Sequence, residues 1–292
     1  MQKLVRLKSF ELVAQDIADV DVNLLHALSI SVGWPHRAKD WDLLRRAGRG
    51  IIAVDGIGRV FGSAMWFPHG EDFATIGLVI TSPRTQAQGT GRWLMDQVLE
   101  RCGDRNLALN ATHAAYRLYV SLGFTREATV YQCQGEVPRT PPETPPLQGE
   151  LRELSKDGLA AIAALDARAF GADRGKLLAL LSESSSTTVL SRGDAIVGYA
   201  MCREFGRGHV VGPVVARDDR DAIHLVAAHL KGLAGRFVRV DTREKDGAFA
   251  EFLQNNRLGL NDTVTTMSKG RRFLNRRPDE PWVYALAGHA LS

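Results

Sequence analysis

The sequence predicts a mixed α/β fold, of the α+β kind, in which two tandem units each hold a mixed central sheet flanked by helices. The same order of elements occurs twice in 292 residues: hairpin, strand, helix, strand, helix, strand. Two pairs of segments match at equivalent places, FGSAMWF with VGYAMCREF and SLGF with RLGL. Between the halves lies EVPRTPPETPPLQGE (136–150), whose prolines exclude a helix interior or a central strand. We therefore predict domains over 1–137 and 151–292, joined by a linker over 138–150.

Composition narrows the class of protein. Hydrophobic residues make up 45% and charged residues 24%, which is typical of a globular chain. No apolar run has the roughly 18 residues of a membrane span, and the N-terminus is too polar for a signal peptide. The three cysteines follow no disulfide or metal-site spacing, so we expect a cytoplasmic protein without a metal. A net charge of +4, thinly spread, does not favour nucleic acid.

The elements of the first half are read in chain order. Strands are expected over 4–12, 50–67 as a hairpin turned at Asp55-Gly56, 73–82, 107–112 and 127–137. Helices are expected over 22–32, just before Gly48, over 92–103 and over 114–124. The second half repeats the order, with a hairpin turned at Gly193-Asp194. A last strand-like segment, WVYALAG (282–288), is expected to pair with an exposed strand edge at the centre of the molecule.

The segment SPRTQAQGTGRWLM (82–95) places two glycines, Gly89 and Gly91, where a strand gives way to a helix. Such a junction presents unpaired backbone N–H groups and the positive end of the helix dipole, which together favour an anion. A Walker loop is absent, and a dinucleotide fingerprint fails because Leu94 stands where its third glycine belongs. The other glycine pair, Gly56-x-Gly58, lies inside a hairpin and fails on context. A different phosphate-binding loop is indicated.

The segment Gln86-Ala87-Gln88-Gly89-Thr90-Gly91 resembles the [RQ]-x-x-G-x-[GA] signature of the GCN5-related N-acetyltransferases (GNAT). Three further features support the resemblance: Val79 and Pro83 in LVITSP, Asn110 and Ala111 in LNAT, and LYVSLGF over 118–124. The match is close over about 75 residues and follows the element order of the whole first half.

The resemblance implies that the first half binds acetyl-coenzyme A. The pyrophosphate would lie on the N–H groups of Gln88 to Arg92, and the pantetheine arm would pair with the strand backbone. The implied cofactor-binding residues are Leu78, Val79, Ile80, Gln86, Ala87, Gln88, Gly89, Thr90, Gly91, Arg92 and Asn110. Two of these have an alternative interpretation: Arg92 as a solvated first-turn side chain, and Asn110 as a residue that satisfies the backbone at a strand end.

The resemblance also implies a general acid, Tyr119, that protonates the departing thiolate; the alternative is a packing tyrosine. The base that takes the amine proton stays open among Glu71, Asp72, His36 and His113. Acceptor-binding residues are expected at Trp34, His36, Arg37 and Glu71, with Trp41 nearby, in the region where the family varies. Structural roles for these residues remain the alternative.

The second half departs from the family pattern. No glycine pair follows GPVVA, Asn255 stands where Tyr119 stands in the first half, and Leu260 replaces the last aromatic residue. Asp241 ends the strand equivalent to that of Asn110, where it either binds an acceptor cation or caps the strand. The sequence thus favours acetyl transfer to a small-molecule amine by direct attack, in a monomer or a homodimer. The alternative is an acyl-CoA sensor without turnover.

Overall fold

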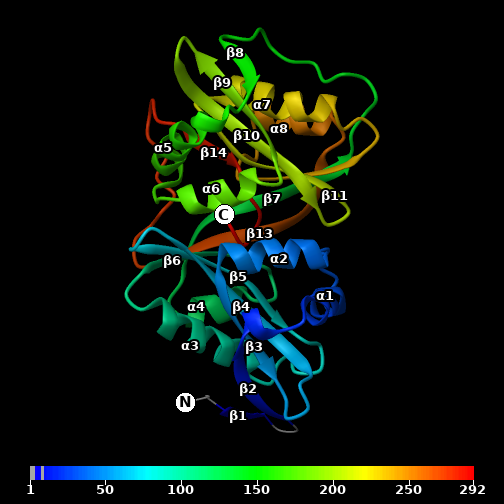
Figure 1. The fold of residues 1–292 in the computed structure, drawn as a ribbon, viewed down its shortest axis with the longest axis vertical. Coiled ribbons are helices and arrows are strands. Elements are labelled where there is room, and N and C mark those ends of the chain that lie inside the picture. Colours follow the sequence, from blue (N-terminus) through cyan, green and yellow to red (C-terminus); the bar gives the residue numbers. More distant parts are fainter. Residues whose placement is uncertain (1–3, 8–9) are drawn as a thin grey trace. The chain divides into compact units, whose positions relative to one another are not determined.

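A computed structural model describes residues 4–7 and 10–292 of the chain (Figure 1). The chain forms two compact units, Met1–Leu107 and Ala108–Ser292, and strand β6 (Asn106–Ala111) begins in the first and ends in the second. Both are mixtures of strands and helices, which confirms the mixed α/β class. The boundaries 1–137 and 151–292 describe the repeat of elements rather than these units, and they stay a prediction.

The first unit contains an antiparallel sheet with the strand order β1-β2-β3-β4-β5. Its strands are β1 (Leu4–Leu7), β2 (Phe10–Asp16), β3 (Arg49–Val54), β4 (Val60–His69) and β5 (Phe73–Thr81). Its helices are α1 (Val22–Ser31), α2 (Ala38–Ala47) and α3 (Thr90–Cys102). Helix α3 packs across β3, β4 and β5, while α1 and α2 pack on one another and on β4 and β3 respectively.

The N-terminal strand differs from the expectation of a single strand over 4–12. The described residues form two antiparallel strands instead, in which Leu4 pairs with Val13 and Leu7 with Phe10. Residues 8 and 9 lie outside the description. The apolar alternation alone could not separate one long strand from a hairpin, because both give a period of two.

The second unit contains a mixed sheet with the order β13-β7-β12-β11-β10-β9-β8, and β6 neighbours β13. Its strands are β7 (Thr125–Glu136), β8 (Glu150–Glu153), β9 (Ser186–Arg192), β10 (Ala195–Phe205), β11 (Gly208–Ala216), β12 (Phe237–Thr242), β13 (Gly259–Lys269) and β14 (Trp282–Ala285). Its helices are α4 (Tyr116–Ser121), α5 (Leu159–Phe170), α6 (Gly175–Ser182), α7 (Asp219–Lys231) and α8 (Ala248–Asn255). Strands β11 and β12 are parallel, and β14 pairs with β11.

Strand β7 belongs to the first half of the sequence but lies between two strands of the second half. It pairs with β12 from Tyr131 to Glu136, and with β13 from Thr125 to Gln134, both antiparallel. Every ladder hydrogen bond of β7 therefore goes to the second repeat. The Pro-rich segment that follows it carries no helix or strand before β8.

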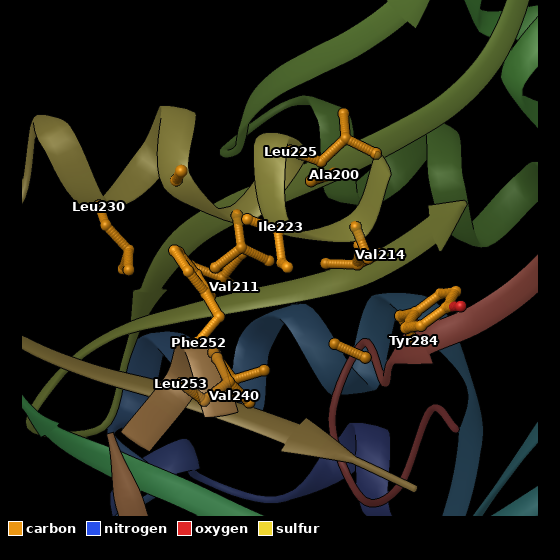
Figure 2. Close-up of a cluster of buried hydrophobic side chains, with 14 of the residues drawn as sticks. Ala200, Val211, Val214, Ile223, Leu225, Leu230, Val240, Phe252, Leu253 and Tyr284 are labelled. Carbon is orange, nitrogen blue, oxygen red and sulfur yellow. The ribbon is translucent and has the colours of Figure 1, made fainter. Parts of the chain in front are cut away.

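The main core of the second unit lies between its sheet and helices α7 and α8 (Figure 2). Helix α7 contributes Ile223, Leu225 and Leu230, and α8 contributes Phe252 and Leu253. These side chains meet the valines of β11 and β12, with the ring of Tyr284 on β14 at the edge of the cluster. The apolar periodicity read from the sequence thus corresponds to a packed core.

Two glycines show that the two repeats share one packing arrangement. A Cβ on Gly62 of β4 would lie 2.7 Å from the Ile80 carbonyl oxygen and 2.9 Å from the Leu94 side chain on α3. A Cβ on Gly198 of β10 would lie 3.0 Å from both the Val215 carbonyl oxygen and the Leu225 side chain on α7. At each glycine, the strand that carries it meets the following strand and the helix that comes after that strand. Glycine is required because the helix approaches the hairpin too closely for a side chain.

A fully buried ion pair holds the helices of the second unit. The Arg174 guanidinium donates to both carboxylate oxygens of Asp166 on α5, at 2.9 and 2.7 Å, and neither side chain is exposed. The Tyr199 hydroxyl donates to the same carboxylate, and the guanidinium stacks on Phe170 at 3.9 Å. Because charges this deep must be paired, each member depends on the others.

We expect Asp166→Ala to lower the free energy of unfolding by about 3–5 kcal/mol, because the buried Arg174 guanidinium then keeps its hydrogen bonds to the Leu291 and Ser292 oxygens but loses its side-chain counter-ion. The control is Arg168→Ala on the same helix, which removes an exposed ion pair with Glu280 and is expected to lose about 0–1 kcal/mol. Urea unfolding followed by circular dichroism measures both. Equal losses in the two variants would contradict the structural role of the buried pair.

We expect residues 1–137, expressed alone, to be insoluble or aggregated, because β7 then has no strand on either edge. Co-expression with residues 138–292 should restore solubility, since the second fragment supplies β12 and β13. Solubility and size-exclusion profiles measure the outcome. A soluble, cooperatively unfolding 1–137 monomer would show that β7 does not need the second repeat.

Candidate functional site

The loop between β5 and α3 has the backbone of an anion site. Gly89 is the N-cap of α3 with a left-handed φ of +93°, and Ala87 is also left-handed at +58°. The first helical hydrogen bond runs from the Trp93 N–H to the Gly89 carbonyl at 3.0 Å. The N–H groups that precede this hydrogen bond in the first turn point out of the helix end, and Gly89 has no side chain to cap them. The first turn of α3 holds no acidic residue, so the positive end of its dipole is not neutralised there.

Buried hydroxyl groups hold this loop in shape. Thr85 donates from Oγ1 to the Phe61 carbonyl at 3.3 Å, and its N–H donates to the Ser82 carbonyl at 2.9 Å. Thr90 Oγ1 donates to the Thr85 carbonyl at 3.2 Å. The role of Thr85 was not predicted from the sequence. A polar residue in a loop next to a motif is too common to indicate such a role.

Strand β5 is distorted where the pantetheine arm is expected. Leu78 has a φ of +51°, and the pairing of β4 with β5 shifts register between Ser63 and Met65. The buried Ser63 hydroxyl donates to the Leu78 carbonyl at 2.7 Å. A bulge of this kind turns backbone groups away from the regular ladder, which leaves them available to another molecule. The role of Ser63 was also not predicted, although a serine within an apolar strand could have indicated it.

Several side chains of the loop form hydrogen bonds or ion pairs with neighbouring groups of the protein. Gln86 is exposed, and its amide donates to the Thr81 carbonyl at 3.2 Å. Gln88 donates to the Arg84 carbonyl at 3.0 Å. Arg92 forms a half-exposed ion pair with Asp96 one turn along the helix, at 3.1 Å. The loop therefore offers an anion its backbone more than its side chains.

An aromatic group lies between α1 and α2 of the first unit. The His36 ring lies 5.7 Å from the Trp34 ring and 6.1 Å from the Trp41 ring. Trp41 is buried and donates from Nε1 to the Ser29 hydroxyl at 3.0 Å. Arg37 is engaged at the start of α2, where its backbone and guanidinium both donate to Asp40, at 2.8 and 2.9 Å. Of the expected acceptor-binding residues, Trp34, His36 and Arg37 are thus brought together.

The other candidate bases are exposed. Glu71 and Asp72 are exposed in the turn before β5, whereas Leu78 and the glycine loop lie at and beyond the far end of that strand. His113, in the second unit, is exposed, with Nε2 3.3 Å from the Thr263 hydroxyl. The geometry therefore does not favour Glu71 at the bulge.

Tyr119 lies on α4 and is buried, with its ring against Phe124. Burial raises the pKa of its phenol above the ordinary value of 10. The side chain is therefore a protonated phenol throughout the neutral pH range.

Asn110, near the end of β6, is fully engaged within the second unit. Its amide nitrogen donates to the His289 carbonyl at 2.7 Å and to the Ser292 hydroxyl at 3.2 Å. Its amide oxygen accepts from the Thr266 hydroxyl at 2.7 Å. These bonds tie the strand end to the last residues of the chain.

The equivalent helix of the second unit, α7, is closed to anions. Asp218 is its N-cap, and the carboxylate accepts from the Asp221 N–H at 2.9 Å. Asp219, in the first turn, accepts from the Phe249 N–H and from the Tyr284 hydroxyl, each at 3.1 Å. Carboxylates thus occupy the positive end of this helix, where α3 has glycine.

Strand β14 fills the second unit's counterpart of the pantetheine position. Strand β11 pairs with β12 only at His209 and Val210, and beyond them β14 pairs with β11 instead. The Leu286 N–H then donates to the Asp241 carbonyl of β12 at 2.8 Å. The last strand-like segment pairs with a strand, as expected, but the partner is β11 inside the sheet of the second unit rather than an exposed edge at the centre of the molecule. The chain itself occupies this side of β11, the repeat equivalent of β5.

Asp241 is held by neighbouring cations. Arg239 donates to both its oxygens at 2.8 Å, and His289 Nε2 lies 3.4 Å from Oδ1. Burial alone would raise the pKa of Asp241, but the charges of Arg239 and His289 outweigh burial and lower it. Its carboxylate is therefore an internal ion-pair partner.

The cysteines are unsuited to nucleophilic catalysis. Burial raises the pKa of Cys102, Cys133 and Cys202 to about 11 each, so the thiolate form is scarce near neutral pH. Within residues 4–7 and 10–292, no cluster of three His, Cys, Asp or Glu side chains is arranged for a metal. No described helix is both long and apolar enough to cross a bilayer.

Both repeats match known acetyltransferase profiles. Residues 25–124 match the "Acetyltransferase (GNAT) family", and residues 162–281 match an "Acetyltransferase (GNAT) domain". The chain is therefore a tandem protein of the GNAT superfamily, an acyltransferase, which confirms the resemblance noted in the sequence.

Individual relatives agree with this assignment. The uncharacterised N-acetyltransferase YitH of Bacillus subtilis is 27% identical over 216 residues, covering 72% of this chain and 74% of its own. A solved Pyrococcus horikoshii protein assigned as an acetyltransferase has a TM-score of 0.80 at 16% identity, over 100% of this chain and 99% of its own. A tandem GNAT protein from the clavulanic acid biosynthesis pathway has a TM-score of 0.59 at 15% identity, over 89% and 99%. At these identities the structures show a shared fold.

We expect Gly89→Ala to raise the Kd for coenzyme A at least about tenfold, because a Cβ blocks close approach to the N–H groups and strains a left-handed residue. Gly103→Ala is the matched control, since Gly103 is left-handed at the other end of α3 and a Cβ there meets nothing within 4 Å. Both variants are expected to lose roughly 1–2 kcal/mol of stability. Calorimetric titration that gives the same Kd for both would exclude the loop as the phosphate site.

Proposed function

We propose that the protein is an N-acetyltransferase that moves the acetyl group of acetyl-CoA to the amine of a small-molecule acceptor by direct attack. One observation carries the proposal: in the first unit, helix α3 begins at Gly89 without a side-chain cap, and the strand before it, β5, has a bulge at Leu78. The family assignment supports acyl transfer, and this geometry supports the first repeat as the cofactor site. We place the enzyme in the cytoplasm, consistent with its three free cysteines.

The fit to coenzyme A rests on charge and on space. The N–H groups of Gln88 to Arg92 would hold the pyrophosphate, with Gln86 and Ala87 shaping the approach to the loop. The backbone of Leu78, Val79 and Ile80 would hold the pantetheine arm. Bound in this way, acetyl-CoA supplies an activated acetyl thioester. In the second unit, Asp218 and β14 occupy the corresponding places, so we propose one cofactor per chain.

The acceptor amine must lose a proton before it attacks. An alkylammonium group with a pKa of about 10.4 costs roughly 4–5 kcal/mol to deprotonate at pH 7. We propose that His36, beside Trp34 and Trp41, is the better placed of the candidate bases in the first unit, since aromatic faces also attract a cationic amine. The acceptor amine then forms its N–C bond as the C–S bond breaks, without an acyl-cysteine, given the raised cysteine pKa values.

Tyr119 would protonate the leaving thiolate of coenzyme A. Because burial raises the pKa of its phenol, the side chain stays protonated throughout the neutral range. A neutral phenol can donate to the thiolate as the C–S bond breaks, which avoids releasing a free thiolate, and it regains the proton that the attacking nitrogen loses as it becomes an amide. Coenzyme A leaves as the thiol.

An acyl-CoA sensor remains the alternative, and one experiment separates it from an enzyme. The full chain is incubated with acetyl-CoA and a library of small amines, and free thiol is measured. Amine-dependent thiol release supports transfer. Tight coenzyme A binding without release for any amine would favour the sensor.

We expect Tyr119→Phe to lower kcat by about 10²–10⁴ while the Kd for coenzyme A changes little, because only the proton donor is lost. Tyr116→Phe, at the start of the same helix, is the control and should keep the wild-type kcat. Steady-state thiol release with the identified acceptor measures both. An unchanged kcat in Tyr119→Phe, with chemistry rate-limiting, would remove the phenol from the mechanism.

A further inference from the structure

Arg243, directly after β12, carries a guanidinium that the fold only partly satisfies. Its Nε donates to the Thr266 hydroxyl at 3.1 Å. Its two terminal nitrogens, Nη1 and Nη2, are buried and have no hydrogen-bond partner within the described part of the chain. A guanidinium presents five N–H donors in a fixed fork, and here the four at the end of the fork are unused.

The neighbouring charges do not explain this arrangement. Burial, reinforced by the positive charge of Arg174, lowers the pKa of Arg243 to about 9, so the group is still a cation near neutral pH. Two carboxylates lie close enough to favour the charge, Glu127 and Glu244. Both are committed elsewhere, and neither is hydrogen-bonded to Arg243. Glu127 accepts from the Phe273 and Leu274 N–H groups, each at 3.0 Å.

Glu244 is committed in the same way. It accepts from Arg276 at 3.2 Å and from the Trp282 indole at 2.8 Å. A buried cation without a hydrogen-bonded counter-ion is unfavourable, and natural proteins seldom keep one without a use. The arrangement therefore points to an anionic partner that is not part of the chain.

The Arg243 guanidinium is held in place by its neighbours. The Thr266 hydroxyl that accepts from Nε itself donates to Asn110 Oδ1 at 2.7 Å, so the guanidinium is linked to the end of β6. On another side its carbon lies 5.6 Å from the centre of the Phe273 ring. A fixed guanidinium loses little freedom when it binds, and its parallel N–H groups match two oxygens of one anion.

We propose that Arg243 is a binding site for an oxyanion, a carboxylate or a phosphate, carried by the acceptor substrate. The hydrogen bonds from Arg243 run through Thr266 to Asn110, whose amide donates in turn to the His289 carbonyl and the Ser292 hydroxyl. That the anion belongs to the acceptor rests on the proposed acetyltransferase function. That Arg243 binds an oxyanion does not.

The first experiment tests anion binding without turnover. The full chain is titrated with sodium acetate and, separately, with inorganic phosphate, and binding is followed by calorimetry at constant ionic strength. We expect Arg243→Gln to weaken binding of the preferred anion at least about tenfold. Arg236→Gln, which removes an exposed arginine just before β12, should leave binding within about twofold. Arg243→Lys, which keeps a charge without the fork, should recover only part of the affinity.

The second experiment identifies the source of the oxyanion. Thiol release is compared for amines with and without it: phenylalanine against phenethylamine, and phosphoethanolamine against ethanolamine. We expect the wild type to prefer the anionic member of one pair at least about tenfold in kcat/KM, and Arg243→Gln to lose that preference with an unchanged Kd for coenzyme A. Preference within the first pair assigns a carboxylate, and within the second a phosphate.

The two proposals fail in different ways. Anion binding that depends on Arg243, with no acetylation of any amine, would overturn the acetyltransferase function and keep the oxyanion site. Acetylation of amines with no anion preference, together with identical titrations for wild type and Arg243→Gln, would overturn the oxyanion site and keep the function.

Discussion

The pairing of β7 with β12 and β13 is the constraint on which the second unit depends. A twelve-residue strand from the first repeat lies between two strands of the second and pairs with both, so its backbone donates and accepts on both edges. Neither repeat can complete its own sheet, so the duplication did not yield two separable modules. This is why the compact units divide near Leu107 while the repeat in the sequence divides near the proline-rich linker.

The two repeats keep the same framework and differ at the helix N-terminus. Gly62 and Gly198 occupy equivalent close contacts with a neighbouring strand and helix, so the framework is under the same packing constraint in both. At the helix that follows, the first repeat has Gly89 and no acidic residue, whereas the second has Asp218 as its cap and β14 against its strand. The second repeat thus has a carboxylate and a strand of its own chain at these places, and it completes the sheet around β7.

Much of this could be predicted from the sequence, because glycines and turns act locally. The Asp55-Gly56 hairpin, the start of α3 beside Gly89 and the end of α4 near Gly123 follow from residue type alone. The position of β7 between two strands of the second repeat could not be predicted, because its apolar pattern suits any pair of neighbouring strands. The bulge at Leu78 could not either, as a non-glycine residue with positive φ leaves no mark in the sequence. Arg243 was hidden among 37 basic residues, because only the fold shows which buried guanidinium nitrogens are left without a hydrogen bond.

The central claim is that one repeat of the pair holds the cofactor and the other has filled the same place with its own chain. The most direct measurement is the number of coenzyme A molecules bound per full-length chain, obtained by calorimetric titration at protein concentrations well above Kd. The account requires one molecule per chain. Two molecules would show that Asp218 and β14 do not close the second repeat, and none would contradict the assignment of the Gly89 loop as a cofactor site.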